Sequence, residues 1–259
     1  MAFLHYQKEG HGPTVVLSHA LGADLQMWDD VTNFLRDELT VIRYDHRNHG
    51  NSEKFVTPFT IDDMADDIAL LIDEVSPGKP VFFVGLSMGG MVAQALASKN
   101  QNRVRAIVIA NSAQYYDTEA KKNWNARIQS IESNGISSIS DAILGRWFSD
   151  KFIENEQKKS NNLYEKFKTI LENCDSKSYN LCCQAIANID FRISNNSISC
   201  PTLVIAGTLD HATPTTLSHA IQGSIKNSKY IEINTAHLSA IEQPALFANH
   251  IKTFFKDLM

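Results

Sequence analysis

One serine stands in a sequence that favours nucleophilic chemistry. Residues 85–89 read GLSMG, directly after the apolar run PVFFV and directly before a segment with helical periodicity. Glycines two positions before and after a serine, at a strand-to-helix turn, are the signature of a nucleophile elbow. The tight turn strains the serine backbone, and small neighbours relieve the resulting clashes. The pattern also arises by chance around a serine that only caps a helix, so Ser87 is a candidate nucleophile that needs partners.

Two residues later in the chain could activate this serine. A serine hydroxyl is a weak nucleophile unless a base takes its proton, and a third group must hold the base. Asp210 follows the apolar run PTLVIAG (201–207), and His237 follows the short run KYIEIN (229–234). Each would lie in a loop at the carboxyl end of a strand, and the order serine, aspartate, histidine is the one that accompanies this elbow. We predict that Ser87, Asp210 and His237 form a catalytic triad.

Each partner also has a simpler interpretation. Asp210 could cap a helix that begins near Pro214, and His237 could be an ordinary loop histidine. His211 and His219 are competing histidines, but neither follows a separate strand near the end of the chain. The joint occurrence in this order, each after a strand, favours the triad.

A serine nucleophile also needs donors for the oxyanion that it creates. Two backbone N–H groups usually stabilise that charge. One belongs to the residue after the serine, here Met88, and the other lies in a loop after an early strand. The loop 18–22, SHALG, follows the run TVVL. We predict that the amide of Leu21 is the second donor and that His19 braces the loop without reacting.

A metal site is a weaker possibility. The segment 45–50, DHRNHG, contains an aspartate and two histidines, but no further ligands complete a coordination sphere, so a hydrogen-bonded turn is favoured. The cysteines have no C-x-x-C spacing, and we expect them to be reduced and mostly buried; they are Cys174, Cys182, Cys183 and Cys200. We predict neither a metal nor a cofactor.

The elements around these residues predict an α/β fold. Short runs rich in β-branched residues recur, and apolar residues three and four apart follow several of them; the runs are 14–20, 40–45, 80–87, 104–112 and 201–207, and the helical segments are 27–39, 60–75 and 88–100. This alternation is typical of an open, mostly parallel sheet flanked by helices.

The alternation stops for about ninety residues and then resumes. The segment 113–199 is polar and helix-prone, and a further strand pattern follows it. An interruption between two strands indicates an insertion rather than a terminal second domain. We predict a core of residues 1–112 and 200–259 and a helical cap at 113–199.

The composition of the chain limits the kinds of partner that it could bind. The chain has 259 residues, 43% of them apolar and 20% charged, as globular domains do. A net charge of −5 without a long basic run gives no footprint for nucleic acid or an anionic membrane. The first residues lack a secretory pattern, and no apolar run is long enough to cross a bilayer. We expect a cytoplasmic protein that acts on a small molecule.

Several of these motifs resemble a known family. The segments GLSMGGMVAQ (85–94), RYDHRNHGNS (43–52), PTLVIAGTLDHATP (201–214) and AHLSAIEQP (236–244) resemble the α/β-hydrolase superfamily. A narrower resemblance to 3-oxoadipate enol-lactonases rests on SHALGADLQMW (18–28), RWF (146–148) and LCCQAIANIDFR (181–192). The chain departs from the motifs of this family at two positions. Asn48 stands where most relatives carry a glycine, and Ala20 stands where many hydrolases carry one.

The narrower resemblance implies a substrate. It implies opening of 3-oxoadipate enol-lactone to 3-oxoadipate through an acyl-enzyme, in protocatechuate and catechol catabolism. That lactone carries a carboxylate, which calls for a cation, and arginine pairs well with carboxylates. Residues of the predicted cap are candidates for this pocket, although each is also compatible with a surface or core position; they are Trp124, Arg127, Arg146, Trp147 and Arg192.

Other activities remain open. A carboxylesterase or a cofactor-free perhydrolase would show the same triad, and some folds of this type serve as small-molecule receptors. Dehalogenases and epoxide hydrolases of the family carry aspartate at the elbow, where this chain has Ser87.

Overall fold

A seven-stranded sheet organises the computed structural model, which describes residues 2–259. The strand order is β1-β3-β2-β4-β5-β6-β7, and each neighbouring pair is parallel except β1 with β3. The strands are β1 (Tyr6–Gly10), β2 (Thr14–Ser18), β3 (Thr40–Tyr44), β4 (Val81–Leu86), β5 (Val104–Ala110), β6 (Thr202–Gly207) and β7 (Ser228–Ile233). The mostly parallel sheet predicted from the sequence is confirmed.

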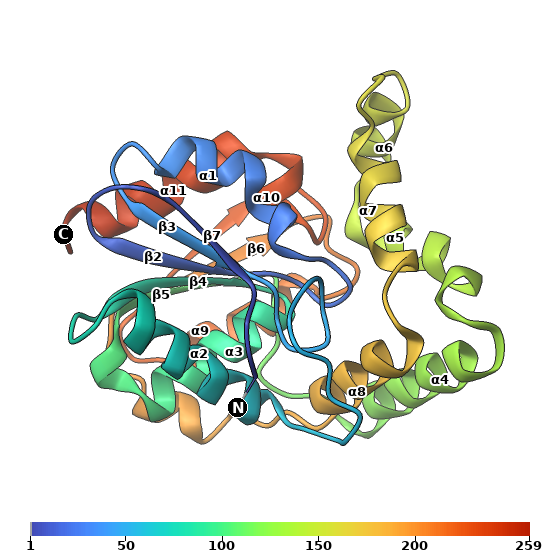
Figure 1. Ribbon diagram of the computed structural model, residues 1–259, viewed down its shortest axis with the longest axis horizontal. Helices are drawn as coiled ribbons and strands as arrows, with labels where there is room; N and C mark the ends of the chain where they lie inside the picture. Colours follow the sequence, from blue (N-terminus) through green and yellow to red (C-terminus); the bar gives the residue numbers. More distant parts are fainter. Residues whose placement is uncertain (1) are drawn as a thin grey trace.

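Helices cover both faces of the sheet, as Figure 1 shows, with α1 and α11 on one face and α2, α3 and α9 on the other. These helices are α1 (Asp29–Leu35), α2 (Ile61–Val75), α3 (Met88–Lys99), α9 (Thr215–Ser224) and α11 (Pro244–Lys256), with the short α10 (Ser239–Glu242) before the last. Short 3-10 helices lie at Leu25–Trp28, Gln101–Arg103, Ile136–Ser138 and Ser194–Ser197. Among the helices of residues 2–259, none has the length and apolarity needed to span a bilayer.

Between β5 and β6 the chain forms a separate group of helices, which stands to the right of the sheet in Figure 1. They are α4 (Thr118–Asn134), α5 (Ser140–Trp147), α6 (Asp150–Glu156), α7 (Leu163–Glu172) and α8 (Ser176–Ala187). Side chains that accept backbone N–H groups begin four of them, namely Asp117, Ser149, Asn162 and Asp175. The predicted inserted helical region is confirmed; the domain boundaries at 112–113 and 199–200 stay a prediction.

The central strands end side by side. Strands β4 and β6 are buried at every position because their sequences are continuous apolar runs, whereas the edge strand β1 is partly exposed along its whole length. The register pairs Ser18 with Gly85 and Leu86 with Ala110, and it pairs Ala110 with Ile205. The loops after β2, β4, β5 and β6 therefore leave the same edge of the sheet.

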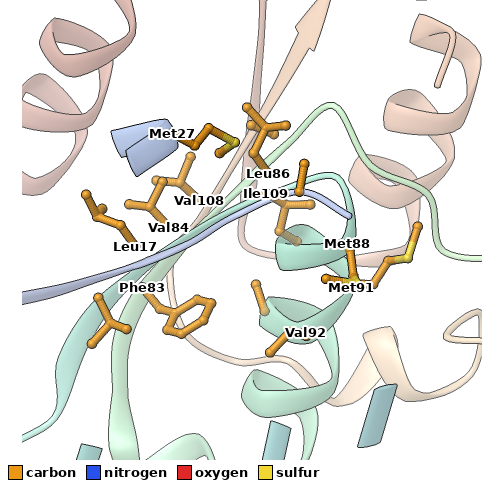
Figure 2. Close-up of a cluster of buried hydrophobic side chains, with 14 of the residues drawn as sticks. Leu17, Met27, Phe83, Val84, Leu86, Met88, Met91, Val92, Val108 and Ile109 are labelled. Atoms are coloured by element: carbon orange, nitrogen blue, oxygen red, sulfur yellow. The ribbon is translucent and has the colours of Figure 1, made fainter. Parts of the chain in front are cut away.

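Close packing holds this edge in place. Figure 2 shows Met88 and Met91 of α3 in one cluster with Leu86 of β4 and Ile109 of β5. Each of these side chains is at most 2% exposed. Dense packing makes such a cluster resistant to local rearrangement, so the turn between β4 and α3 is supported from below.

Candidate active site

Ser87 occupies the turn between β4 and α3 with a strained backbone. Its φ is 57° and its ψ is −115°, in a region that costs a residue other than glycine about 1–3 kcal/mol. A Cβ on Gly85 would lie 2.0 Å from the carbonyl oxygen of Gly89, and a Cβ on Gly89 would lie 2.1 Å from that of Ser18. Both glycines are therefore required by close backbone approach, and Gly89 lets the turn pack directly against the end of β2.

The structure brings Ser87, Asp210 and His237 together. The imidazole Nε2 of His237 lies 2.8 Å from the hydroxyl oxygen of Ser87, and its Nδ1 lies 2.8 Å from Oδ2 of Asp210. A proton on Nδ1 satisfies the carboxylate and leaves Nε2 free to accept the serine proton. The imidazole and the carboxylate are almost completely buried. This arrangement can generate an alkoxide-like nucleophile at Ser87.

Hydrogen bonds hold the Asp210 carboxylate in its charged form. Oδ1 accepts the backbone N–H groups of Ala212 (2.7 Å) and Thr213 (2.9 Å), and Oδ2 accepts the Thr213 hydroxyl (2.7 Å) and the Asn111 amide (3.0 Å). Burial alone would raise the pKa of Asp210, but the charge of His237 and these hydrogen bonds outweigh it and lower the pKa to about 2. The carboxylate is therefore ionised throughout the neutral range.

Two of these hydrogen-bond partners of Asp210, Asn111 and Thr213, were not predicted from the sequence. Asn111 directly follows β5, and Thr213 lies three residues after Asp210. Thr213 also lies 3.2 Å from Nδ1 of His237 through its hydroxyl. The one available signal for Asn111 was a polar residue at the carboxyl end of the strand beside the elbow strand, where parallel α/β folds place functional groups.

The predicted oxyanion donors are the backbone N–H groups of Leu21 and Met88. Leu21 lines the same cavity as Ser87, and Met88 is the first residue of α3, where an N–H has no partner within the helix. Among residues 2–259, no protein atom accepts a hydrogen bond from either backbone N–H. Both groups are therefore available to a bound oxygen atom, and their role as an oxyanion hole stays a prediction.

Buried histidines brace the loop that carries Leu21. His19 donates to the carbonyl oxygen of Ala20 (2.7 Å) through Nδ1, and its Nε2 accepts the backbone N–H of His46 (3.0 Å). His49 accepts the N–H of Gly22 (3.0 Å) through Nε2. Burial lowers the pKa of the imidazoles of His19, His46 and His49, and that of His49 falls to about 3. Neutral rings are needed here, because the two accepting nitrogens must be free of protons.

The segment 45–50 forms a hydrogen-bonded turn. Oxygens of Asp45 accept the N–H groups of Leu25 (2.8 Å) and Asn51 (2.9 Å). Asn48 adopts a φ of 66°, which asparagine tolerates better than most residues, so this turn does not require a glycine at position 48. Across residues 2–259, no three histidine, cysteine, aspartate or glutamate side chains are grouped to hold a metal ion.

A cavity of about 480 Å³ opens over Ser87 and His237, between the strand ends and the inserted helices. Among its lining residues are four of the predicted pocket residues, Trp124, Arg127, Arg146 and Trp147, together with Tyr116, Tyr179 and His211. Arg192 does not line this cavity. Its guanidinium pairs with Asp190 (2.7 Å) and stacks on Tyr115 (3.6 Å to the ring centroid), so it is already engaged at the surface.

The two arginines in the cavity have no ion-pair partner. Among the described residues, no carboxylate oxygen lies within 4.0 Å of either guanidinium. Arg127 lies over the ring of Trp124 (4.7 Å), and Arg146 donates to the carbonyl oxygen of His211 (2.8 Å). Burial, and then the charge of Arg127, lowers the pKa of Arg146. Two cations near a nucleophile favour an anionic ligand.

Known proteins share this architecture. A family model described as alpha/beta hydrolase fold matches residues 13–244. The chain is 35% identical to 3-oxoadipate enol-lactonase 1 of Acinetobacter baylyi, over 96% of this chain and 90% of that protein.

Solved structures give the same result. The enol-lactonase of Burkholderia xenovorans LB400 superimposes with a TM-score of 0.91 at 31% identity, over 98% of this chain and 96% of that one. A thermophilic esterase of Thermogutta terrifontis, solved with malate bound, has a TM-score of 0.90 at 27% identity, over 98% of this chain and 93% of that one.

Proposed function

Because this chain belongs to the α/β-hydrolase fold family, we propose that it is a serine hydrolase that opens a small anionic lactone, with 3-oxoadipate enol-lactone as its substrate. One observation carries the proposal: a hydrogen-bonded series from Ser87 through His237 to Asp210 faces a cavity that also holds two arginines without carboxylate partners. The family resemblance predicted from the sequence is confirmed, and the substrate is the part that needs an experiment.

In the first half of the reaction, Ser87 becomes acylated. His237 Nε2 takes the hydroxyl proton while the serine oxygen bonds to the lactone carbonyl carbon. The carbonyl oxygen becomes an oxyanion that the N–H groups of Leu21 and Met88 stabilise. Collapse of this intermediate breaks the ring carbon–oxygen bond. The leaving oxygen departs as an enolate, takes a proton from His237 and tautomerises to a ketone, so it is expelled more easily than an alkoxide.

In the second half, water releases the acyl group. His237 takes a proton from a water molecule, whose oxygen attacks the acyl carbon, and the same two N–H groups hold the new oxyanion. Breaking the bond to the serine oxygen restores Ser87 as it regains its proton. The products are a carboxylate and a ketone on one carbon chain, so no cofactor or metal is required for this sequence of steps.

The charge of the cavity supports an anionic substrate. A protein of net charge −5 repels anions at long range, so a carboxylate substrate needs local cations. Arg127 and Arg146 supply them on the side of the cavity that the inserted helices form. The relatives named as 3-oxoadipate enol-lactonases act on a lactone of this kind, by their names. Arg192 does not belong to this anion site, because it lies outside the cavity lining and pairs with Asp190.

The decisive experiment compares two substrates with two proteins. Purified wild type and Ser87→Ala are assayed with 3-oxoadipate enol-lactone and with a neutral aryl ester such as 4-nitrophenyl acetate. We expect the wild type to open the lactone with the higher kcat/KM and Ser87→Ala to be inactive on both. Activity that persists in Ser87→Ala would overturn the nucleophile assignment, and a large preference for the aryl ester would overturn the lactonase assignment.

A carboxylesterase is the second candidate, and the likeness to the Thermogutta terrifontis esterase favours it. The same assay separates the two, because an esterase prefers the neutral ester. A receptor with little or no turnover would be indicated if a fluorophosphonate probe failed to label Ser87, since labelling requires an activated serine.

A further inference from the structure

Asn111 lies behind the proposed triad, fully buried and in an unusual conformation. It follows β5 with a φ of 46°, and its backbone N–H donates to the carbonyl oxygen of Ile205 in β6. Asparagine accepts this left-handed conformation more readily than most side chains. Since a smaller or more flexible residue would occupy the turn with less strain, the side chain needs an explanation of its own.

That side chain joins three parts of the site. Its Nδ2 donates to Oδ2 of Asp210 (3.0 Å), and its Oδ1 accepts the hydroxyl of Ser239 (2.7 Å), two residues after His237. Gly207 leaves room for this amide, because a Cβ on Gly207 would lie only 2.9 Å from Nδ2 of Asn111. One amide therefore connects the end of β5 to the aspartate loop and to the histidine loop.

We propose that Asn111 is a positioning residue, whose amide orients the Asp210 carboxylate toward His237 and is itself oriented by Ser239. The inference rests on the proposed function of Ser87, Asp210 and His237. Asn111 is absent from the cavity lining, so it acts through Asp210 and touches no substrate.

The amide selects one carboxylate orientation. Oδ2 receives Asn111, the Thr213 hydroxyl and His237, whereas Oδ1 receives only backbone N–H groups. Without the amide, the carboxylate loses the donor that comes from the strand side, and rotation about its last bond becomes easier. When one donor is lost, the negative charge of the carboxylate also acts more strongly on its remaining partner, His237, and this stabilises the imidazolium. The freer rotation of the carboxylate should slow catalysis, because the imidazole is held less firmly toward Ser87. The stabilised imidazolium should move the acid midpoint of labelling to higher pH.

Other charged or titratable groups near Asp210 remain unchanged in the test. Besides His237, the described residues whose pKa the charge of Asp210 affects are Tyr116 and Arg146 on the cavity side and Glu242 at the end of α10. The variant Asn111→Gly removes a neutral amide and leaves all of these groups in place. A shift of the acid midpoint would therefore not come from the gain or loss of a charged group.

The test follows the rate at which a fluorophosphonate probe labels Ser87 between pH 5 and pH 9. This readout needs no knowledge of the natural substrate. Asn111→Gly removes the amide and tolerates the positive φ. Ser239→Ala removes only the hydroxyl that orients it. Asn195→Gly is the matched control, because Asn195 is an equally buried amide that bonds to Gln94, Gln114 and Ser224 instead.

We expect Asn111→Gly to lower the plateau labelling rate by about tenfold and to move the acid midpoint upward by about half a unit to one unit. Ser239→Ala should change both in the same direction by less, and Asn195→Gly should change neither. With a neutral aryl ester, Asn111→Gly should lower kcat and leave KM within about twofold.

Two outcomes overturn the inference alone. One is a folded Asn111→Gly with the wild-type rate and midpoint, and the other is a slower rate without a midpoint shift, which a structural defect would also give. If Asn111→Gly does not fold, an unchanged profile in Ser239→Ala overturns it. If Ser87→Ala is labelled as fast as the wild type, the proposed function itself fails, which is a separate result.

Discussion

The imidazole Nε2 of His237 lies 2.8 Å from the hydroxyl oxygen of Ser87, although 150 residues separate the two in the chain. The serine comes from the turn after β4, and the histidine comes from the loop after β7. Their contact depends on the carboxylate behind the imidazole, on the close backbone approach at the elbow and on the fold of the loops around them. Each of these supports can be removed separately.

Asp210→Asn should lower kcat by about 10⁴-fold, because an amide at this position favours the wrong imidazole tautomer while preserving the geometry. KM for a neutral aryl ester should stay within about twofold, since Asp210 does not contact the substrate in the proposed mechanism. Steady-state kinetics measure both. Asp175→Asn is the matched control, because Asp175 only caps α8. Equal losses of kcat in both variants would contradict the proposed role of Asp210.

Gly89→Ala should destabilise the fold by about 3 kcal/mol, because the added Cβ would meet the Ser18 carbonyl and neither backbone segment can move easily. Gly145→Ala is the control. Gly145 lies in α5, and a Cβ added there would have no atom within 4 Å, so alanine should raise stability by up to about 1 kcal/mol. Urea unfolding at equilibrium measures both, and a Gly89→Ala variant of wild-type stability would contradict the requirement.

Arg127→Ala and Arg146→Ala should each raise KM for the anionic lactone by about tenfold or more, which corresponds to the loss of a charge-assisted hydrogen bond. KM for a neutral aryl ester should change by less than about twofold. Arg192→Ala is the control, because that guanidinium pairs with Asp190 outside the cavity. An unchanged lactone KM in both cavity variants would rule out these arginines as the carboxylate anchor.

The buried histidines should make the fold sensitive to mild acid. The folded-state pKa values of His19, His46 and His49 lie below the ordinary value of 6.5, so the unfolded chain binds more protons as the pH falls. Their stabilising contribution is therefore complete above pH 6.5 and is lost progressively toward the folded pKa, about 3 for His49. For His49 alone, the loss between pH 7.5 and pH 5 should be about 2 kcal/mol.

Urea unfolding at pH 7.5 and at pH 5 checks this expectation. His49→Asn should reduce the difference between the two pH values, whatever it does to stability at pH 7.5. His219→Asn is the control, because the side chain of His219 is 55% exposed. The same acid-induced loss in wild type and His49→Asn would contradict a contribution from this imidazole.

Local patterns were sufficient to predict the scaffold and the order of the chemical groups. The alternation of apolar runs with helical periodicity reflects burial of each element, which repeats every two or every three to four residues and needs no distant contact. Likewise, the glycines around Ser87 are needed because a Cβ at either position would clash with backbone atoms a few residues away or at the end of the adjoining strand. Asp210 and His237 could be singled out because each follows a strand.

Only the tertiary structure decided which further polar groups contact Asp210 and which arginines line the cavity. Asn111 reaches Asp210 across 99 residues, and nothing near Asn111 in the chain indicates an aspartate partner. Arg146 and Arg192 are alike as residues of a helix-rich insertion, yet one lines the cavity and the other pairs with Asp190. Such contacts depend on strand register and on how the inserted helices pack over the sheet edge. Both are set by the summed packing of many side chains, so no short segment of the sequence encodes them.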